Sequence, residues 1–291
     1  MTHPSPTELS PEQITALLRP TPNWQRRDVQ RSVLIALVST LVVFGGLAYI
    51  VSGSTGWQVV QQAFFSPEHF VAAFPMVLKG FWLNVRIFLI AEPIILLWGL
   101  ILAIIRSTRS PVLFPLRAAA VTYVDIFRGA PAILVILTLG FGMPALRLPG
   151  VPSSPIFWGT LACILTSSAY QSETFRAGIE SVHTSQRAAA RSLGLSSTQA
   201  MRYVVLPQAI RTVIPPKLSG FVGLQKETAL ISVIGPLEAT RQAQIYAGMT
   251  FNFTSYVVAG VLFIAITIPL ARFTDYLLQR TAQQRQMGGA V

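Results

Sequence analysis

The feature that most constrains this chain is a series of long apolar runs with few charges. The first, residues 33–51, carries no charge and is long enough for a helix to cross a bilayer. We expect the third apolar run, at about residues 131–146, to be lengthened at its N-terminal side by residues 116–128, so that the two form one long helix. The pattern predicts an all-α integral membrane protein with six transmembrane helices, at about residues 33–51, 81–105, 131–146, 156–170, 218–235 and 256–270.

The composition agrees with a membrane protein and excludes several other classes. Only 11% of the residues are charged and 52% are hydrophobic, whereas a soluble domain carries about 25% charged residues. A cytosolic enzyme, a disordered chain and a coiled coil are therefore excluded. The net charge of +11 would indicate nucleic-acid binding in a soluble protein. Here the basic residues cluster between apolar runs, which indicates membrane topology and no nucleic acid.

The placement of these basic clusters predicts an orientation. Most of the 22 Lys and Arg residues lie in alternate segments: before the first run, after the second, after the fourth and after the last. The positive-inside rule then places both termini in the cytoplasm, with a cytoplasmic tail at residues 1–32 and another at 281–291. Six spans satisfy this rule, whereas five would leave one basic cluster outside.

The longest polar segment, residues 171–217, is predicted to form a helical cytoplasmic loop. Ser185 is placed to cap a short helix at 186–193, and Gly194 suits the left-handed residue that ends such a helix. Ser196 and Gln199 have the spacing of a capping box for a second helix, which Pro207 should bend. The spacing alone allows two interpretations: a knob that a protein partner grips, or an amphipathic segment lying on anionic lipid.

Several motifs in this loop and around it carry a family resemblance. Residues 188–194 (AAARSLG) and 204–207 (VVLP) resemble the EAA loop of permease subunits of bacterial ATP-binding cassette importers. More narrowly, the chain resembles the polar amino-acid uptake branch over about residues 77–280. The motifs that carry this are FRGAP (127–131), ETFRAGI (173–179), ARSLG (190–194), QAMRY (199–203), LPQA (206–209) and KETALISVIG (226–235).

The resemblance implies a fold and a docking role. It implies a five-helix importer domain at residues 76–280, so residues 33–51 are an added span. The sequence departs from the family pattern at one position of the loop, where Ala188 replaces the family's glutamate. It also implies that the loop docks into a groove of the ATPase subunit. We assign the coupling contacts to Ala189, Ala190, Arg191, Gly194, Met201, Leu206 and Pro207. The alternative is that Leu206 and Pro207 only seat the loop against the bilayer.

Three charges fall inside predicted spans, where a charge costs at least about 2.5–3.5 kcal/mol. They are Glu92, Lys226 and Glu227. One hypothesis is that they line the translocation path, where a carboxylate and an ammonium would match a zwitterionic solute. The other is that Lys226 and Glu227 pair with neighbouring spans or with a second copy and only hold structure.

The sequence contains no phosphate-binding G-x-x-x-x-G-K-[ST] motif, and its scattered histidines and single cysteine predict no metal site. We therefore expect a transport subunit without catalytic residues or a cofactor of its own, since the partner uses the ATP. The resemblance implies an ATP-driven importer for polar amino acids or related solutes in the bacterial inner membrane. Its expected partners are an ATPase subunit, an extracytoplasmic solute-binding protein, a second identical or different permease subunit, and lipid. An ion-gradient-driven carrier is the alternative, and a membrane scaffold is a third class.

Overall fold

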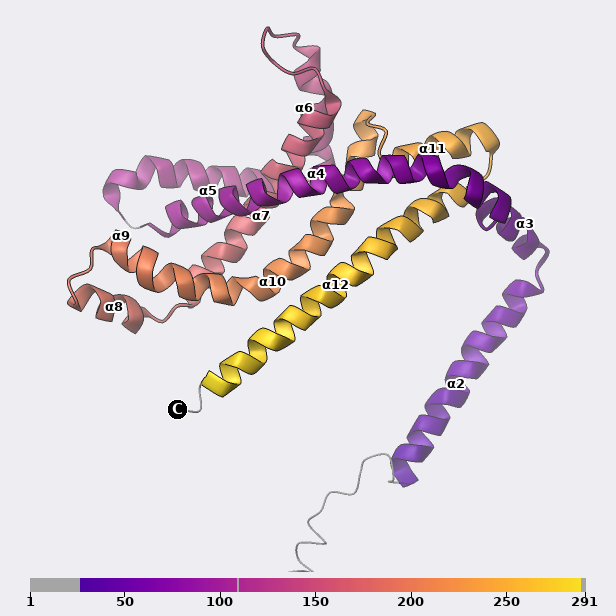
Figure 1. Ribbon diagram of the computed structural model, residues 1–291, viewed down its shortest axis with the longest axis horizontal. Coiled ribbons are helices and arrows are strands. Elements are labelled where there is room, and N and C mark those ends of the chain that lie inside the picture. The colour runs from indigo at the N-terminus through magenta and orange to yellow at the C-terminus, as the bar shows by residue number, and fades with distance from the viewer. Residues whose placement is uncertain (1–26, 109, 289–291) are drawn as a thin grey trace, which may run out of the picture. The chain divides into compact units, whose positions relative to one another are not determined.

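The computed structural model describes residues 27–108 and 110–288 (Figure 1). The expected tail at residues 1–32 lies mostly outside the described residues. The chain divides into residues 1–62 and residues 63–291. The first unit contains α2 (Arg27–Ser52), which includes the uncharged run, and most of α3 (Thr55–Phe64). The described residues of both units are helices and connecting turns, without strands, so the all-α prediction is confirmed.

The second unit is organised along α4 (Pro67–Ser107), a helix of 41 residues. Ser66 caps its first turn by accepting a hydrogen bond from the His69 backbone amide, and Pro67 occupies a first-turn position where its missing donor costs little. The first half of α4 packs against α11 and α12, and its second half packs against α5 and α7 (Figure 1). This helix therefore connects the two ends of the second unit.

The expected long helix over residues 116–146 is wrong. A short 3-10 turn, η3 (Pro111–Leu113), leads into α5 (Phe114–Gly129), which ends before Pro131. The next helix, α6 (Ala132–Ala145), is bent by 102° from the direction of α5. Pro131 explains the break, because a proline disfavours helical geometry at the residue before it. Ala130 accordingly adopts an extended conformation, with φ −82° and ψ 133°.

The next helices are longer than their apolar runs. α7 (Pro155–Ser181) continues past the predicted span end at residue 170, so the first part of the predicted loop 171–217 extends this helix. Two short helices, α8 (Thr184–Ser192) and α9 (Ser197–Ala200), follow, then a widened segment, η4 (Met201–Val205). α10 (Leu206–Glu227) then returns alongside α7 (Figure 1). The loop segment is thus helical, as predicted.

The last part of the unit begins with a tight 3-10 segment, η5 (Thr228–Ile234), which ends at Gly235 with φ +105°. Ile231 and Ile234 of this segment lie directly over Gly159 and Gly140, where an added Cβ would meet them at 2.7 and 2.5 Å. Two glycines therefore allow η5 to approach α6 and α7 closely. The chain ends with α11 (Ala239–Thr250) and α12 (Thr254–Gly288).

The number of helices that satisfy a membrane-span criterion is smaller than the expected six. Among the described residues, three helical stretches are long and apolar enough to cross a bilayer: Gln30–Ser52, Thr55–Ser107 and Thr254–Tyr276. The bent pair α5–α6 would make a fourth. α7 and α10 do not qualify, so the six-span assignment remains a prediction.

Candidate coupling loop and polar cavities

The corner between α8 and α9 has the geometry that the sequence predicts at Gly194. Its φ is +85°, the left-handed conformation that glycine adopts without strain. The Gly194 amide donates to the Arg191 carbonyl at 3.0 Å, and the Leu195 amide donates to the Ala190 carbonyl at 3.2 Å. The Arg191 side chain also donates to the Leu195 carbonyl, at 2.7 Å. Arg191 therefore fixes the corner from both its backbone and its guanidinium.

The helix starts in the loop agree only partly with the sequence prediction. The capping box is confirmed: Gln199 donates its amide to the Ser196 hydroxyl, and the Ser196 amide donates to the Gln199 side chain. The first helix, however, begins earlier than predicted, at Thr184. Its cap is His183, whose ring nitrogen accepts from the Ser185 amide, in place of Ser185 itself.

Pro207 shows its effect one turn earlier than its own position. Because proline has no amide hydrogen, the turn before it lacks one ordinary helical hydrogen bond. The Leu206 amide donates to the Met201 carbonyl, five residues back, so η4 is a widened turn that runs straight into α10. Such widened turns are found often at functional sites.

The predicted coupling residues divide into an inner and an outer group. Ala190 is buried, and Met201 and Leu206 pack against the cluster that includes Phe175 and Val213. These three hold the loop on the bundle. Exposed on its outer surface are Ala189, Arg191, Gly194 and Pro207.

Sequence reasoning missed two apolar side chains of that outer surface. Leu193, directly before the glycine corner, is 83% exposed, and Tyr203 is 61% exposed. The glycine at 194 was the available signal for Leu193, since the residue before such a corner projects from the end of its helix.

Glu92 has a partner that the sequence did not predict. Its side chain is 5% exposed and forms an ion pair with Lys217 of α10, whose side chain is 10% exposed. The Lys217 ammonium also lies 5.0 Å from the centre of the Phe221 ring. Lys217 is the last residue of the predicted loop 171–217, and nothing in the local sequence links it to α4.

A cavity of about 200 Å³ lies beside this ion pair, between α4, α7 and α10. Glu92, Lys217 and Glu227 line it together with polar residues of α7, and Ser167 donates to the Glu227 carboxylate at 3.2 Å. Lys226 is exposed and does not line this cavity. Two of the three predicted path residues are thus brought together, and Lys217 takes the place expected for Lys226.

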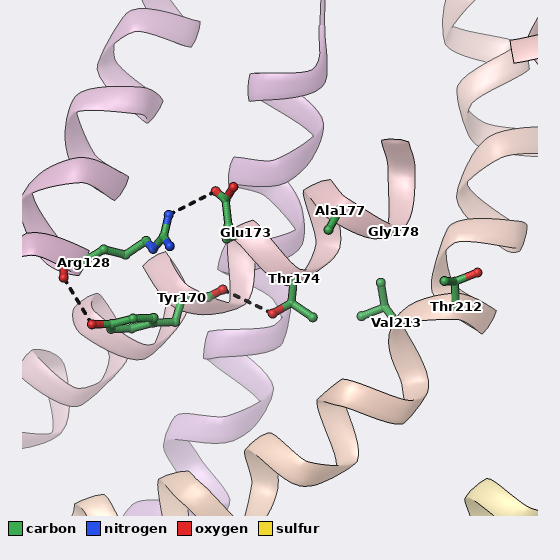
Figure 2. A pocket seen from close by; sticks show the side chains of 8 residues that line it. All are labelled: Arg128, Tyr170, Glu173, Thr174, Ala177, Gly178, Thr212 and Val213. Atoms are coloured by element: carbon green, nitrogen blue, oxygen red, sulfur yellow. Dashed lines mark hydrogen bonds and ion pairs between the residues drawn. The ribbon is translucent and has the colours of Figure 1, made fainter. Parts of the chain in front are cut away.

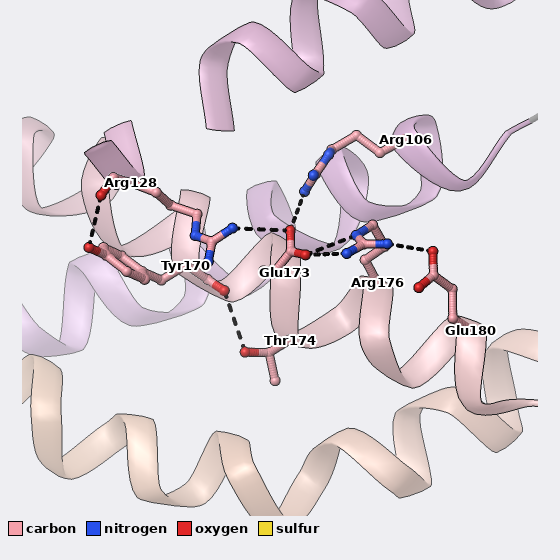
Figure 3. A network of polar contacts seen from close by, with 7 residues as sticks. All are labelled: Arg106, Arg128, Tyr170, Glu173, Thr174, Arg176 and Glu180. Atoms are coloured by element: carbon pink, nitrogen blue, oxygen red, sulfur yellow. Dashed lines mark hydrogen bonds and ion pairs between the residues drawn. The ribbon is translucent and has the colours of Figure 1, made fainter. Parts of the chain in front are cut away.

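A charged network lies one turn further along α7 (Figure 3). The Glu173 carboxylate forms ion pairs with three arginines. A guanidinium nitrogen of Arg106, at the end of α4, lies 2.7 Å from a carboxylate oxygen, one of Arg128, at the end of α5, lies 3.5 Å away, and Arg176 pairs from the same helix. Arg176 also pairs with Glu180 at 2.5 Å. One carboxylate therefore ties the ends of α4 and α5 to α7, about two turns before α7 ends.

The network also sets the protonation state of Glu173. Hydrogen bonds from Arg176, and then the pairing with Arg106, lower the pKa of the Glu173 carboxyl to about 2, although burial acts in the opposite direction. Glu173 is therefore ionised at any physiological pH, and it balances one of the three arginines.

A larger cavity, of about 510 Å³, opens next to this network between α7 and α10 (Figure 2). Arg128 and Tyr170 form one side of it, and Thr212 and Val213 of α10 form the other. Tyr170 and Thr174 also line the smaller cavity, so the two cavities share part of their wall. Among the described residues, no group of His, Cys, Asp and Glu side chains is arranged to hold a metal ion.

Comparison with known proteins places this arrangement in a family. Residues 95–283 match the family model described as the binding-protein-dependent transport system inner membrane component. The chain belongs to this family. It is therefore an inner-membrane permease subunit of an ATP-binding cassette importer and not itself a nucleotide-binding enzyme. The larger cavity and the whole α8–α9 corner fall inside the matched region, as do the lining residues of the smaller cavity except Glu92.

Individual relatives agree with the family over most of their length. The probable glutamine ABC transporter permease protein GlnM of Bacillus subtilis is 34% identical over 210 residues, which cover 71% of this chain and 94% of that protein. The glutamate/aspartate import permease protein GltK of Escherichia coli is 30% identical over 219 residues, covering 73% and 96%.

Solved structures show the same fold. A crystal structure of an amino acid ABC transporter with histidines matches with a TM-score of 0.64 and 30% identity, covering 72% of this chain and 96% of that one. The MetNI methionine ABC transporter matches with a TM-score of 0.60 at 15% identity, covering 71% and 96%. The second likeness concerns the fold alone.

Proposed function

We propose that this permease subunit carries polar amino acids or close analogues, and that its α8–α9 corner is the contact with a cytoplasmic ATPase subunit. The observation that carries the proposal is the outer surface of that corner. It presents Leu193 and Tyr203 to the outside, on a turn fixed by Gly194 and Arg191. A rigid projection with exposed apolar side chains fits a partner's groove better than a segment that arginines hold on lipid.

The same proposal gives the chain its topology. Six spans, with 33–51 as an added helix before an importer domain at 76–280, place the α8–α9 corner and both tails (1–32 and 281–291) in the cytoplasm, following the positive-inside rule. A solute-binding protein then approaches from the opposite face. A second permease subunit, identical or different, completes the path, and the chain itself holds no cofactor.

The path runs past the smaller cavity. Glu92 and Glu227 contribute carboxylates there and Lys217 contributes an ammonium, so the wall has groups of both signs for a zwitterionic solute. Lys226, which is exposed and outside this cavity, is assigned to contacts with a neighbouring span or subunit. The substrate class follows from the relatives, whose names include glutamine and glutamate/aspartate.

The test is uptake of labelled amino acids into vesicles that contain this chain, an ATP-binding cassette ATPase and a solute-binding protein from the same organism. We expect uptake to require ATP and to fail in Gly194→Arg. The matched control is Gly150→Arg, because Gly150 also has a positive φ, of +80°, and open space around it, but lies in the α6–α7 connection. Uptake driven by a proton or sodium gradient without the ATPase would instead establish the secondary carrier.

A further inference from the structure

The Glu173 network carries more positive than negative charge. Three guanidinium groups, from Arg106, Arg128 and Arg176, face two carboxylates, Glu173 and Glu180. Arg106 bonds one Glu173 oxygen at 2.7 Å, and Arg176 bonds the other oxygen and Glu180. Arg128 is the arginine whose charge is left over, because its single approach to Glu173 is 3.5 Å, longer than the 2.7–2.9 Å of a charge-assisted hydrogen bond.

Arg128 is nevertheless held in place. Its backbone carbonyl accepts a hydrogen bond from the Tyr170 hydroxyl at 3.2 Å, and its guanidinium lies 5.8 Å from the centre of the Tyr170 ring. The side chain is 40% exposed and forms one side of the larger cavity (Figure 2). An arginine has five N–H donors in a fixed fork that matches a carboxylate. In the described part of the chain, none of the Arg128 side-chain donors makes a hydrogen bond.

The rest of the cavity suits a small polar solute. Its volume of about 510 Å³ falls within the roughly 300–1,000 Å³ of small-molecule sites. Thr174 and Thr212 place hydroxyl groups on its wall, which donate to carbonyls of their own helices and remain free to accept. Ala177 adds only a methyl group to the wall, and Gly178 lets Val213 of α10 pack closely against α7. The shared wall of Tyr170 and Thr174 separates this cavity from the smaller one, where the carboxylates of Glu92 and Glu227 lie. The larger cavity is lined by Arg128 and by the Glu173 carboxylate, which Arg106 and Arg176 already neutralise. The smaller cavity is lined by two carboxylates and the Lys217 ammonium. The excess charge is therefore positive beside the larger cavity and negative in the smaller one.

We propose that the larger cavity is a second binding station for the transported solute, in which Arg128 recognises the α-carboxylate of an amino acid. The inference rests on the proposed function, because it takes its ligand class from it. The solute's carboxylate binds the Arg128 fork, and its ammonium lies toward the carboxylates beyond Tyr170 and Thr174. Arg128 is then a solute-binding residue that Glu173 and Tyr170 orient.

The test is isothermal titration of the purified permease–ATPase complex, without binding protein, with L-glutamine, L-arginine and L-glutamate and with the α-carboxamide of each. At least one amino acid should bind, with its carboxamide roughly tenfold or more weaker, as expected for the loss of a charged hydrogen-bond pair. Arg128→Gln should lose the same factor or more, and Arg128→Lys should lose less. The matched control is Arg272→Gln, since the Arg272 side chain is 82% exposed and lies on α12.

Several results would overturn the assignment. The assignment is wrong if none of the three amino acids binds, or if the carboxamides bind as tightly as the amino acids. It is also wrong if Arg128→Gln keeps the wild-type affinity, or if Arg272→Gln loses as much affinity as Arg128→Gln. Competition by inorganic phosphate as effective as that by an amino acid would overturn it as well. Size-exclusion profiles and thermal unfolding check that each variant is folded. If ATP-driven uptake works but these titrations fail, only the second station is refuted. If uptake itself fails with every amino acid, the proposed function is refuted as well.

Discussion

The buried ion pair between Glu92 and Lys217 leads to a quantitative prediction about stability. Both side chains are almost completely enclosed, at 5% and 10% exposure. Glu92→Gln or Lys217→Met would therefore leave one charge in the interior without its partner. Removing one member of such a pair costs about 3–5 kcal/mol, whereas replacing both by packed neutral side chains is often close to neutral.

The surroundings of the two charges decide which single variant is worse. Lys217 keeps a second favourable contact, the Phe221 ring at 5.0 Å, which is worth about 0.5–2 kcal/mol. Glu92 has no such alternative, because its two oxygens accept no hydrogen bond in the described part of the chain. We expect Glu92→Gln to cost about 3 kcal/mol and Lys217→Met about 5 kcal/mol, the two ends of the range for a broken buried pair.

The assay is thermal unfolding of the purified protein in one detergent, for both single variants and the double variant. At about 2–4 °C per kcal/mol, the single variants should lower Tm by about 6–20 °C, while the double variant stays within a few degrees of the wild type. The exposed pair Arg272 and Asp275, 3.9 Å apart, is the control, because such pairs contribute about 0–1 kcal/mol. Additive losses in the double variant, or single shifts as small as those of the control pair, would refute the reasoning.

Three further predictions concern single positions. Gly194→Ala forces a side chain into a φ of +85° and should lower the free energy of unfolding by about 1–2 kcal/mol and reduce ATP-driven uptake. Its matched control is Gly248→Ala, which lies in α11 with open space around it: this variant should leave the free energy of unfolding unchanged or raise it and leave uptake unchanged. Gly140→Ala places a Cβ 2.5 Å from Ile234 and should lower Tm, and Ile234→Val should restore part of the loss. The pKa of the Glu173 carboxyl is lowered from 4.5 to about 2 in the folded protein. The ionised carboxylate therefore contributes fully to the free energy of unfolding above pH 4.5, and this contribution is lost as the pH falls toward 2. A profile of Tm against pH should show this loss for the wild type and lack it for Glu173→Gln.

Features that depend on neighbouring residues were predictable from the sequence. The capping box at Ser196 and the left-handed corner at Gly194 each follow from a few adjacent residues, and the structure has both. The break before Pro131 is equally local, since a proline disfavours helical geometry at the residue before it, but the expectation of one long helix did not take the proline into account. The helix start at His183 was missed because Ser185 is the commoner capping residue.

Features that depend on the packing of distant segments were not predictable. Lys217 reaches Glu92 only because α10 returns alongside α7 and meets α4. The same holds for Glu173, which gathers arginines from the ends of α4 and α5. A charge in an apolar run indicates that a partner exists, since an unpaired one is costly. It does not indicate which segment supplies that partner.

The polarity of α7 and α10 connects the span count with the proposed path. These two helices line both cavities, and within the proposed spans they carry polar side chains such as Ser167 and Glu227. Within a bilayer, polar side chains face a protein interior or a water-filled cavity and not lipid. Helices that border a polar path therefore fall below a hydropathy threshold because of their function. Under the proposed topology α7 and α10 supply the two spans that the hydropathy criterion does not find. Cysteines introduced at Tyr170 and Thr174, which line the cavities, should react with a water-soluble maleimide in intact vesicles. A cysteine at Ile264, an exposed apolar position of α12, should not react.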